Sequence, residues 1–233
     1  MIGHPADLIV LASASARRRE LLSRLGVHFQ VCPADVDESP RPGETALSTQ
    51  TRITRDKART AQAKLAAAGS ALADQPIIAC DTTVLLDGEM LNKPASPDEA
   101  REMLRRLRGR VHEVQSVIVM RHGQDEITDT VRTQVLMREY SDDEIEAYIA
   151  TGDPFDKAGG YAVQHPRFRP VAEMRGCPLN VVGLALCRLR ICLPQLPDPV
   201  PVCQSFSGRP CPAYPDEHHV VTQVNPTFGS QVT

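Results

Sequence analysis

The sequence predicts an α/β fold in which short buried strands alternate with capped helices. Two apolar runs, residues 8–12 and 77–80, are typical of strands buried on both faces. Capping boxes that begin at Ser96 and Ser141 open segments with apolar residues at helical spacing. Residues 111–137 form a long antiparallel pair around a polar turn. With 233 residues, 42% of them hydrophobic, the chain can bury one main core.

The first predicted strand leads directly into a helix whose first turn is basic. Ser15 is the expected N-cap, and Gly26 ends the helix because glycine readily adopts the left-handed conformation. Arg17 and Arg18 lie in the first turn, where the helix dipole disfavours a cation by up to about 1 kcal/mol. Together with Ser13 and the backbone N–H groups, they would form a phosphate cradle. Arginines that extend into solvent around an ordinary cap are the open alternative.

An acidic loop and a long helix come next. After a strand expected over residues 27–31, the loop contains Asp35, Asp37 and Glu38. Hard divalent cations prefer oxygen ligands, so the loop is either part of a cation site or a solvated turn. The following helix, expected over residues 44–68, carries Lys57 and has few apolar positions, which indicates packing along one narrow face.

The run at residues 77–80 is followed by Asp81, which we expect where this strand leaves the sheet. Asp87-Gly88 predicts a tight hairpin turn, which would fold Lys93 back towards Asp81. A carboxylate and an ammonium that converge at a strand end suit a metal-assisted reaction on a phosphate. The alternative is an aspartate bonded to backbone N–H groups and an unrelated surface lysine.

The C-terminal third contains one further candidate binding segment. Residues 153–164 form a glycine-containing loop whose Lys157 and Gln164 are available to a ligand. A last apolar segment ends near Leu193. Residues 194–233 contain many prolines and show no periodicity, so we expect a main domain over residues 1–193 and a mobile tail after it.

Composition and missing motifs narrow the chemistry. The net charge of −3 gives no overall field that would attract nucleic acid, and aromatic residues are only 4%. No apolar run approaches the roughly 18 residues of a membrane span, and the N-terminus lacks a signal-type pattern, so we expect a cytoplasmic protein. The seven cysteines include no C-x-x-C pair, and Cys203, Cys211, His218 and His219 fit no standard zinc-finger spacing. P-loop, Rossmann, zincin and serine-hydrolase signatures are absent.

Seven short motifs stand in an order that resembles one known family. They are LASASARR at 11–18, DVDE at 35–38, DKA at 56–58, ACDT at 79–82, NKP at 92–94, DKAGGY at 156–161 and NVVGL at 180–184. Together they resemble the Maf family of nucleoside triphosphate pyrophosphatases over about residues 8–193. The resemblance implies a mixed twisted sheet flanked by helices, like that of inosine triphosphate pyrophosphatases. It also implies a homodimer and the metal-dependent release of pyrophosphate from a nucleoside triphosphate.

The resemblance assigns roles to individual residues, and it favours the functional interpretation of each segment above. Asp81 matches the family's proton acceptor. The matched base-selecting residues of the branch that acts on dTTP and UTP are Arg17, Thr82 and Gln164. The matched phosphate-facing lysines are Lys57 and Lys93, and the expected substrate contacts also include Ser13, Arg18 and Lys157. The carboxylates expected to hold Mg²⁺ or Mn²⁺ are Asp35, Asp37, Glu38 and Asp81.

Three departures from the family pattern bear on substrate choice. Ala16 replaces a helix-initiating proline, His165 replaces the glycine after the glutamine, and Ala185 replaces a proline. Alanine is an excellent helix former, so the first change should cost little, whereas His165 could narrow or redirect the base pocket. Alternative functions are the hydrolysis of 7-methyl-GTP or another non-canonical nucleotide, and a non-catalytic role in regulating cell division.

Overall fold

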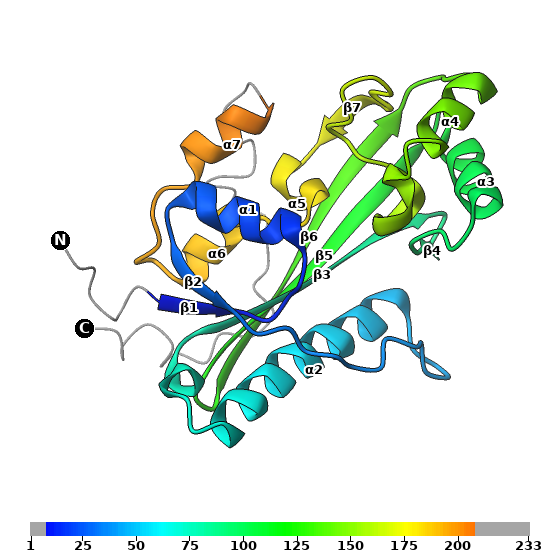
Figure 1. The fold of residues 1–233 in the computed structure, drawn as a ribbon. Coiled ribbons are helices and arrows are strands. Elements are labelled where there is room, and N and C mark those ends of the chain that lie inside the picture. Colours follow the sequence, from blue (N-terminus) through cyan, green and yellow to red (C-terminus); the bar gives the residue numbers. More distant parts are fainter. Residues whose placement is uncertain (1–7, 208–233) are drawn as a thin grey trace.

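A seven-stranded sheet of mixed strand direction runs through the computed structural model, which describes residues 8–207 (Figure 1). The strands are β1 (Leu8–Leu11), β2 (His28–Val31), β3 (Ile77–Leu86), β4 (Glu89–Leu91), β5 (Val111–His122), β6 (Asp125–Met137) and β7 (Val171–Arg175). Their order is β2-β1-β3-β5-β6-β7, with β4 paired to β3. Because β1 is parallel to β2 and β3 while the other pairs are antiparallel, the predicted α/β class and mixed sheet are confirmed.

The helices of the described residues are α1 (Ala16–Leu25), α2 (Ala46–Ala67), α3 (Pro97–Leu107), α4 (Asp142–Ile149), α5 (Pro178–Val182), α6 (Leu186–Cys192) and α7 (Val200–Ser207), with short turns η2 (Ala71–Asp74), η3 (Asp153–Asp156) and η4 (Ala158–Gly160). The three with a predicted N-cap begin directly after Ser15, Ser96 and Ser141. The Ser15 hydroxyl accepts a hydrogen bond from the N–H of Arg18, and Gly26 ends α1 with φ 79°. Ser141 closes a capping box with Glu144 in α4.

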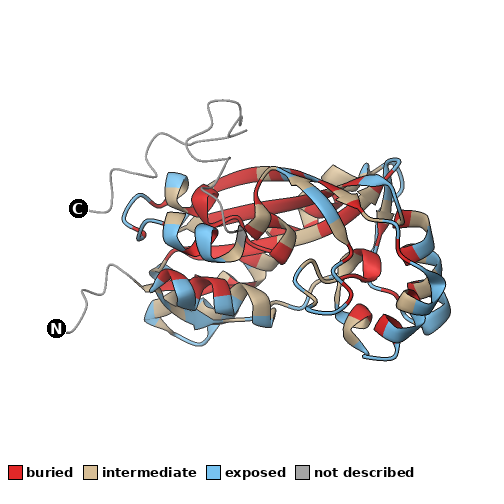
Figure 2. Cartoon of the chain, turned by 90° about the horizontal axis from the view of Figure 1, so that it is seen from above, coloured by how far each residue is buried: buried red, intermediate tan, exposed pale blue. Residues whose placement is uncertain are grey.

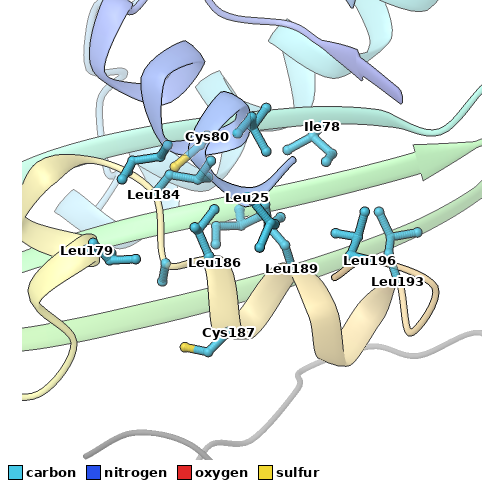
Figure 3. Packing of buried hydrophobic residues seen from close by; sticks show 14 of the residues in the cluster. Leu25, Ile78, Cys80, Leu179, Leu184, Leu186, Cys187, Leu189, Leu193 and Leu196 are labelled. Carbon is cyan, nitrogen blue, oxygen red and sulfur yellow. The ribbon is translucent and has the colours of Figure 1, made fainter. Parts of the chain in front are cut away.

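The sheet separates two main apolar clusters because successive side chains of a strand point to opposite faces. Ile77 and Ala79 of β3 pack with Ala58 of α2, which covers one face (Figure 1). Ile78 and Cys80 pack on the other face with leucines of α1 and α6 (Figure 3). A third cluster lies under α3 and α4. Buried residues follow the strands and the inner sides of the helices (Figure 2), and no helix within residues 8–207 is long and apolar enough to cross a membrane.

The central strand is longer than predicted, and this corrects the expected position of Asp81. β3 continues from Ile77 to Leu86 without a break, so Asp81 lies inside the strand rather than at its end. The reason is composition, since Thr82, Thr83 and Val84 are β-branched residues that favour extended backbone. The predicted turn is confirmed, because Asp87 has φ 53° and Gly88 has φ 84°, and β4 follows it.

The expectation of a mobile tail from residue 194 is wrong for residues 194–207. Leu196, Val202 and Cys203 are buried in the cluster that includes α1 and α6. The helix α7 forms despite the prolines because Pro201 falls in its first turn, where no N–H partner is lost. The guanidinium of Arg24 lies 4.9 Å from the ring centroid of Phe206. Residues 208–233, which include Cys211, His218 and His219, lie outside the described residues.

We therefore expect a chain that ends at Leu193 to melt on the order of 10 °C below a chain that ends at Ser207. The shorter chain loses the three side chains buried by this segment, and each such burial is worth roughly 2 kcal/mol. Differential scanning calorimetry of the two chains measures the difference. Melting temperatures within about 1 °C of each other would show that α7 adds nothing to stability.

Candidate active site

The central strand β3 changes its partner along one edge. On this edge β1 pairs in parallel with Ile77 and Ile78, and β4 pairs in antiparallel fashion with residues 84–86. On the opposite edge β5 pairs with β3 from Ile77 to Leu85. Within the described chain, residues 80–83 therefore carry no strand on the β1 and β4 side. Asp81 and Thr82 lie in this gap, just beyond the end of β1 and the serine-containing turn that starts α1.

Asp81 faces α2 and is paired with Lys57. The Nζ atom of Lys57 donates to Oδ1 of Asp81 at 3.0 Å and lies 2.8 Å from Oε1 of Glu38 in the acidic loop. The side chain of Lys57 is only 12% exposed and that of Asp81 is 20% exposed, so water screens this pair weakly. Segments far apart in the sequence thus place one ammonium between two carboxylates.

The surroundings keep Lys57 charged. Burial alone would lower its pKa, but the charge of Asp81 and the hydrogen bonds to Glu38 and Asp81 outweigh this effect and leave the pKa above its ordinary value. Lys57 therefore carries a full positive charge at neutral pH. A partly exposed cation beside an open strand edge can bind a phosphate oxygen of a substrate.

A second group of predicted residues meets on the opposite face of β3. The guanidinium of Arg18 donates from Nη1 to Ser13 Oγ at 2.9 Å, from Nη2 to Thr82 Oγ1 at 3.3 Å and from Nε to the carbonyl of Gly183 at 3.0 Å. Thr82 Oγ1 also lies 2.8 Å from Oγ of Ser116 on β5. Arg18 thus ties α1, β3 and the end of α5 together, which fixes the turn that leads into α1.

The remaining basic residues of the predicted site share one carboxylate. Arg17 donates from Nη1 to Oδ2 of Asp156 at 2.9 Å, and Lys157 donates to the other oxygen of Asp156 and to Oδ1 of Asp153 at 2.9 Å. Partial burial would raise the pKa of Asp156, but the hydrogen bond from Lys157 and the charge of Arg17 lower it overall. The basic first turn of α1 therefore already holds an anionic group in the form of this carboxylate.

Four predicted site residues take no part in the hydrogen bonds and ion pairs described above. Lys93 and Gln164 are exposed, and within residues 8–207 neither forms a hydrogen bond or ion pair. The hairpin does return the chain along β3, with Leu91 opposite Val84, but within residues 8–207 no hydrogen bond or ion pair joins Lys93 to Asp81. Asp35 is exposed, and the carboxylate of Asp37 accepts a hydrogen bond from the N–H of Ser39 at 2.9 Å.

The donor set still fits a hard divalent cation of the kind that the sequence predicts. Among the described residues, no three His, Cys, Asp or Glu side chains form a ready metal cluster. Asp81 and Glu38 nevertheless point their carboxylates at the same cationic atom, Nζ of Lys57. Mg²⁺ is commonly held by one or two carboxylates together with substrate phosphates, and these two carboxylates match that pattern.

Sequence reasoning missed two residues of α2 that hold the backbone of the site in place. Gln50 on α2 is fully buried and donates to the backbone carbonyl of Asp81 at 3.0 Å. Arg52 fixes the acidic loop by donating to the carbonyls of Asp37 and Ser39 and to the carboxylate of Glu44, whose pKa it lowers to about 2. The one sequence signal was the thin apolar face of α2, which leaves polar side chains to fill the buried side.

The structure gives each of the three departures a local role. Ala16 is the first residue of α1, and the helix begins there without proline because Ser15 caps it. The ring of His165 packs edge-on against Tyr148 with centroids 4.8 Å apart, and its Nδ1 accepts a hydrogen bond from the N–H of Phe168. Ala185 is fully buried at the start of α6. The ring of His165 therefore stabilises the turn that follows Gln164.

A buried histidine anchors the segment that carries Asp156 and Lys157. Nε2 of His112 on β5 lies 2.7 Å from the hydroxyl of Tyr161, the residue that follows η4. Burial lowers the pKa of His112 to about 4, because the charged imidazolium would lose its hydration. The imidazole is therefore neutral in the native state at pH values where an exposed histidine is protonated.

This low pKa predicts that the native state becomes less stable in mild acid. As the pH falls from about 6.5 to about 4, the unfolded chain binds a proton at His112 that the native chain does not, which costs the native state on the order of 3 kcal/mol. Urea unfolding between pH 4.5 and pH 7 should show a steeper loss of stability for the native sequence than for His112→Gln, which cannot titrate. Parallel curves for the two proteins would contradict the prediction.

Comparisons with known proteins agree with the motifs. The family described as Maf-like protein matches residues 8–196. A dTTP/UTP pyrophosphatase of Thermomicrobium roseum is 45% identical over 218 residues, which are 90% of this chain and 95% of that protein. One from Chromobacterium violaceum is 43% identical over 76% of this chain and 88% of that protein. Among solved structures, the Staphylococcus aureus Ham1 protein is 18% identical with a TM-score of 0.39, over 56% of this chain and 71% of that chain.

Proposed function

The chain belongs to the Maf family, and from this membership we propose that it hydrolyses dTTP and UTP to the nucleoside monophosphate and pyrophosphate. The observation that carries the proposal is the largely buried Lys57 ammonium beside the Asp81 carboxylate, at the place where β3 has an open edge. Relatives named dTTP/UTP pyrophosphatase at 40–45% identity support the choice of nucleotide.

In the proposed reaction, different residues of this chain accept the proton, neutralise the phosphates and position the substrate. Asp81 Oδ would accept the proton of the water that attacks the α-phosphate. Lys57, Arg17 and Lys157 would neutralise the charge that develops on the phosphate oxygens, after exchanging their carboxylate partners for the substrate. Arg18 would hold Thr82 and the turn that leads into α1 in position to contact the nucleobase of the substrate.

A divalent cation, Mg²⁺ or Mn²⁺, is part of the proposal, and Asp81 and Glu38 would hold it. When bound, such a cation acidifies water and neutralises a phosphate chain, which matters here because a carboxylate alone is a weak base at neutral pH. The loop carboxylates of Asp35 and Asp37 would join only if the loop moved, since within the described residues neither forms an ion pair with Lys57.

A panel of nucleotides tests the proposal. We expect pyrophosphate release from dTTP and UTP to exceed release from 7-methyl-GTP, ITP and ATP by at least about 10-fold, a ratio that base contacts commonly provide. Chelation with EDTA should abolish turnover, and Mg²⁺ or Mn²⁺ should restore it. Release confined to 7-methyl-GTP or ITP would correct the substrate, and no release from any nucleotide would favour the non-catalytic role in cell division.

The assembly implied by the family is also a proposal. We propose a homodimer, and sedimentation equilibrium should give twice the chain mass of 25.5 kDa. A mass of one chain across the micromolar range would exclude it. The same dimeric or monomeric sample should serve for the nucleotide panel, so that activity and assembly refer to one species.

A further inference from the structure

We propose that Gln50 is a positioning residue for the reaction, because its buried amide holds the backbone of Asp81 and sets α2 so that Lys57 meets the Asp81 carboxylate. The inference rests on the proposed function and deepens it. Gln50 has no exposed surface, and its Nε2 donates to the carbonyls of Asp81 and Gln115, both at 3.0 Å. These carbonyls belong to the neighbouring strands β3 and β5, so one side chain links α2 to both strands at the site.

The amide of Gln50 is held in one orientation by a chain of hydrogen bonds that leads through buried Gln115 to Arg132 at the surface. Gln115 is 1% exposed and donates from its own Nε2 to Oε1 of Gln50 at 2.9 Å. Oε1 of Gln115 in turn accepts from Nε of Arg132 on β6 at 3.1 Å. Both hydrogens and the oxygen of the Gln50 amide are therefore used, and a fully bonded buried amide is rigid.

The geometry of α2 connects the hydrogen bonds of Gln50 to the position of Lys57 beside Asp81. Gln50 and Lys57 are seven residues apart on α2, which is close to two turns, so they lie on the same face of the helix. Side chains on a helix lean towards its N-terminus, and the Lys57 side chain therefore reaches back towards Gln50 and Asp81. A shift of α2 along the sheet would move Nζ of Lys57 away from the Asp81 carboxylate.

The hydrogen bond from Gln50 to the Asp81 carbonyl is important because β3 has an open edge at Asp81. Within the described residues, neither β1 nor β4 pairs with residues 80–83, so Asp81 is held by β5 on one side and by Gln50 from α2. A displacement of a reacting group by about 1 Å can cost on the order of 10²-fold in rate. Among the described residues, Gln50 forms no hydrogen bond with the carboxylate of Asp81 or the ammonium of Lys57, so it acts through the backbone carbonyl of Asp81.

Thr54 provides a matched control on the same helix. It is also fully buried and polar, and its hydroxyl donates to the carbonyl of Gln50 at 2.7 Å, but within the described part of the chain it forms no hydrogen bond with Asp81. Thr54→Val removes one buried hydrogen bond while keeping the shape of the side chain. Gln50→Met likewise keeps the length of the side chain but cannot bind either carbonyl.

Steady-state kinetics with dTTP and Mg²⁺, together with melting temperatures, test the inference. We expect Gln50→Met to lower kcat about 10-fold with KM within about 3-fold, because the loss affects alignment more than nucleotide binding. Thr54→Val should lose a comparable few degrees of melting temperature and keep kcat within about 2-fold. Gln115→Met should give a smaller loss of kcat, and the double variant should match Gln50→Met because both residues act through one chain of bonds.

The outcomes separate the inference from the proposed function. Wild-type chain that releases no pyrophosphate overturns the proposed function and the inference with it. Active wild-type chain with equal kcat in Gln50→Met and Thr54→Val overturns the inference alone. If Gln50→Met does not fold, Gln115→Met decides, because it releases the Gln50 amide without removing it, and unchanged kcat in that variant contradicts the role of Gln50.

Discussion

Replacing Asp81 with asparagine is expected to lower kcat for dTTP by about 10³-fold, because an amide cannot accept the proton of the attacking water. The fold should survive, since Oδ1 of asparagine can still accept the hydrogen bond from Lys57 at the 3.0 Å separation seen for the carboxylate. KM should change by less than about 3-fold, because the basic residues that would bind the phosphates remain. Pyrophosphate release under saturating dTTP and Mg²⁺ measures the effect.

The matched control for this variant is Asp74→Asn, an aspartate in η2, which follows the C-terminal end of α2, whereas the acidic loop precedes the N-terminal end of α2. It removes the same charge and should keep kcat within about 2-fold. Turnover of Asp81→Asn near the wild-type rate, with the protein folded, would remove Asp81 from the reaction. The Lys57–Asp81 pair would then have a structural role only.

The sequence predicted local structure well because capping and turn signals are local. Ser15 caps α1, Gly26 ends it, and Asp87-Gly88 forms the hairpin turn as expected. The end of β3 was placed too early because the apolar run stops at Cys80, whereas the strand continues through three β-branched residues. Strand length depends on pairing with β5, which a short apolar run does not reveal.

The arrangement of the site followed only in part from the sequence. Once β3 is known to continue past Asp81, strand alternation places Asp81 on the face of Ala79 and Thr82 on the face of Cys80. The predicted residues therefore form two groups on opposite faces of one strand rather than one group. Which helix covers which face is a long-range property, and no motif signals it.

The partners of the basic residues were also beyond the reach of sequence reasoning. The interpretation of the first turn of α1 required an anion, and the structure supplies one in Asp156, about 140 residues away in the chain. The Asp156 carboxylate thus balances the charges of Arg17 and Lys157, and a substrate phosphate would compete with it for them. The phosphate cradle stays a prediction, whereas the carboxylate partner of Arg17 depended on the fold.

Replacing Lys57 with methionine is expected to lower kcat/KM for dTTP by on the order of 10²-fold or more, because a largely buried cation that would face the phosphates is lost. Removal of the ammonium also leaves the carboxylates of Asp81 and Glu38 close together without a partner. Unlike Asp81→Asn, this variant should raise KM as well as lower kcat, since Lys57 would contact substrate before and during the reaction.

Two control variants on α2 test whether the effect of Lys57→Met is specific to this position and depends on more than its charge. Lys64→Met removes an exposed lysine that donates to the carbonyl of Pro33 at 3.2 Å, and it should leave kcat/KM within about 2-fold. Lys57→Arg keeps the charge in a planar group that cannot sit between two carboxylates in the same way, so it should recover only part of the activity. A KM unchanged in Lys57→Met while kcat falls would mean that Lys57 acts only by orienting Asp81, and the phosphate contacts would then belong to Arg17 and Lys157 alone.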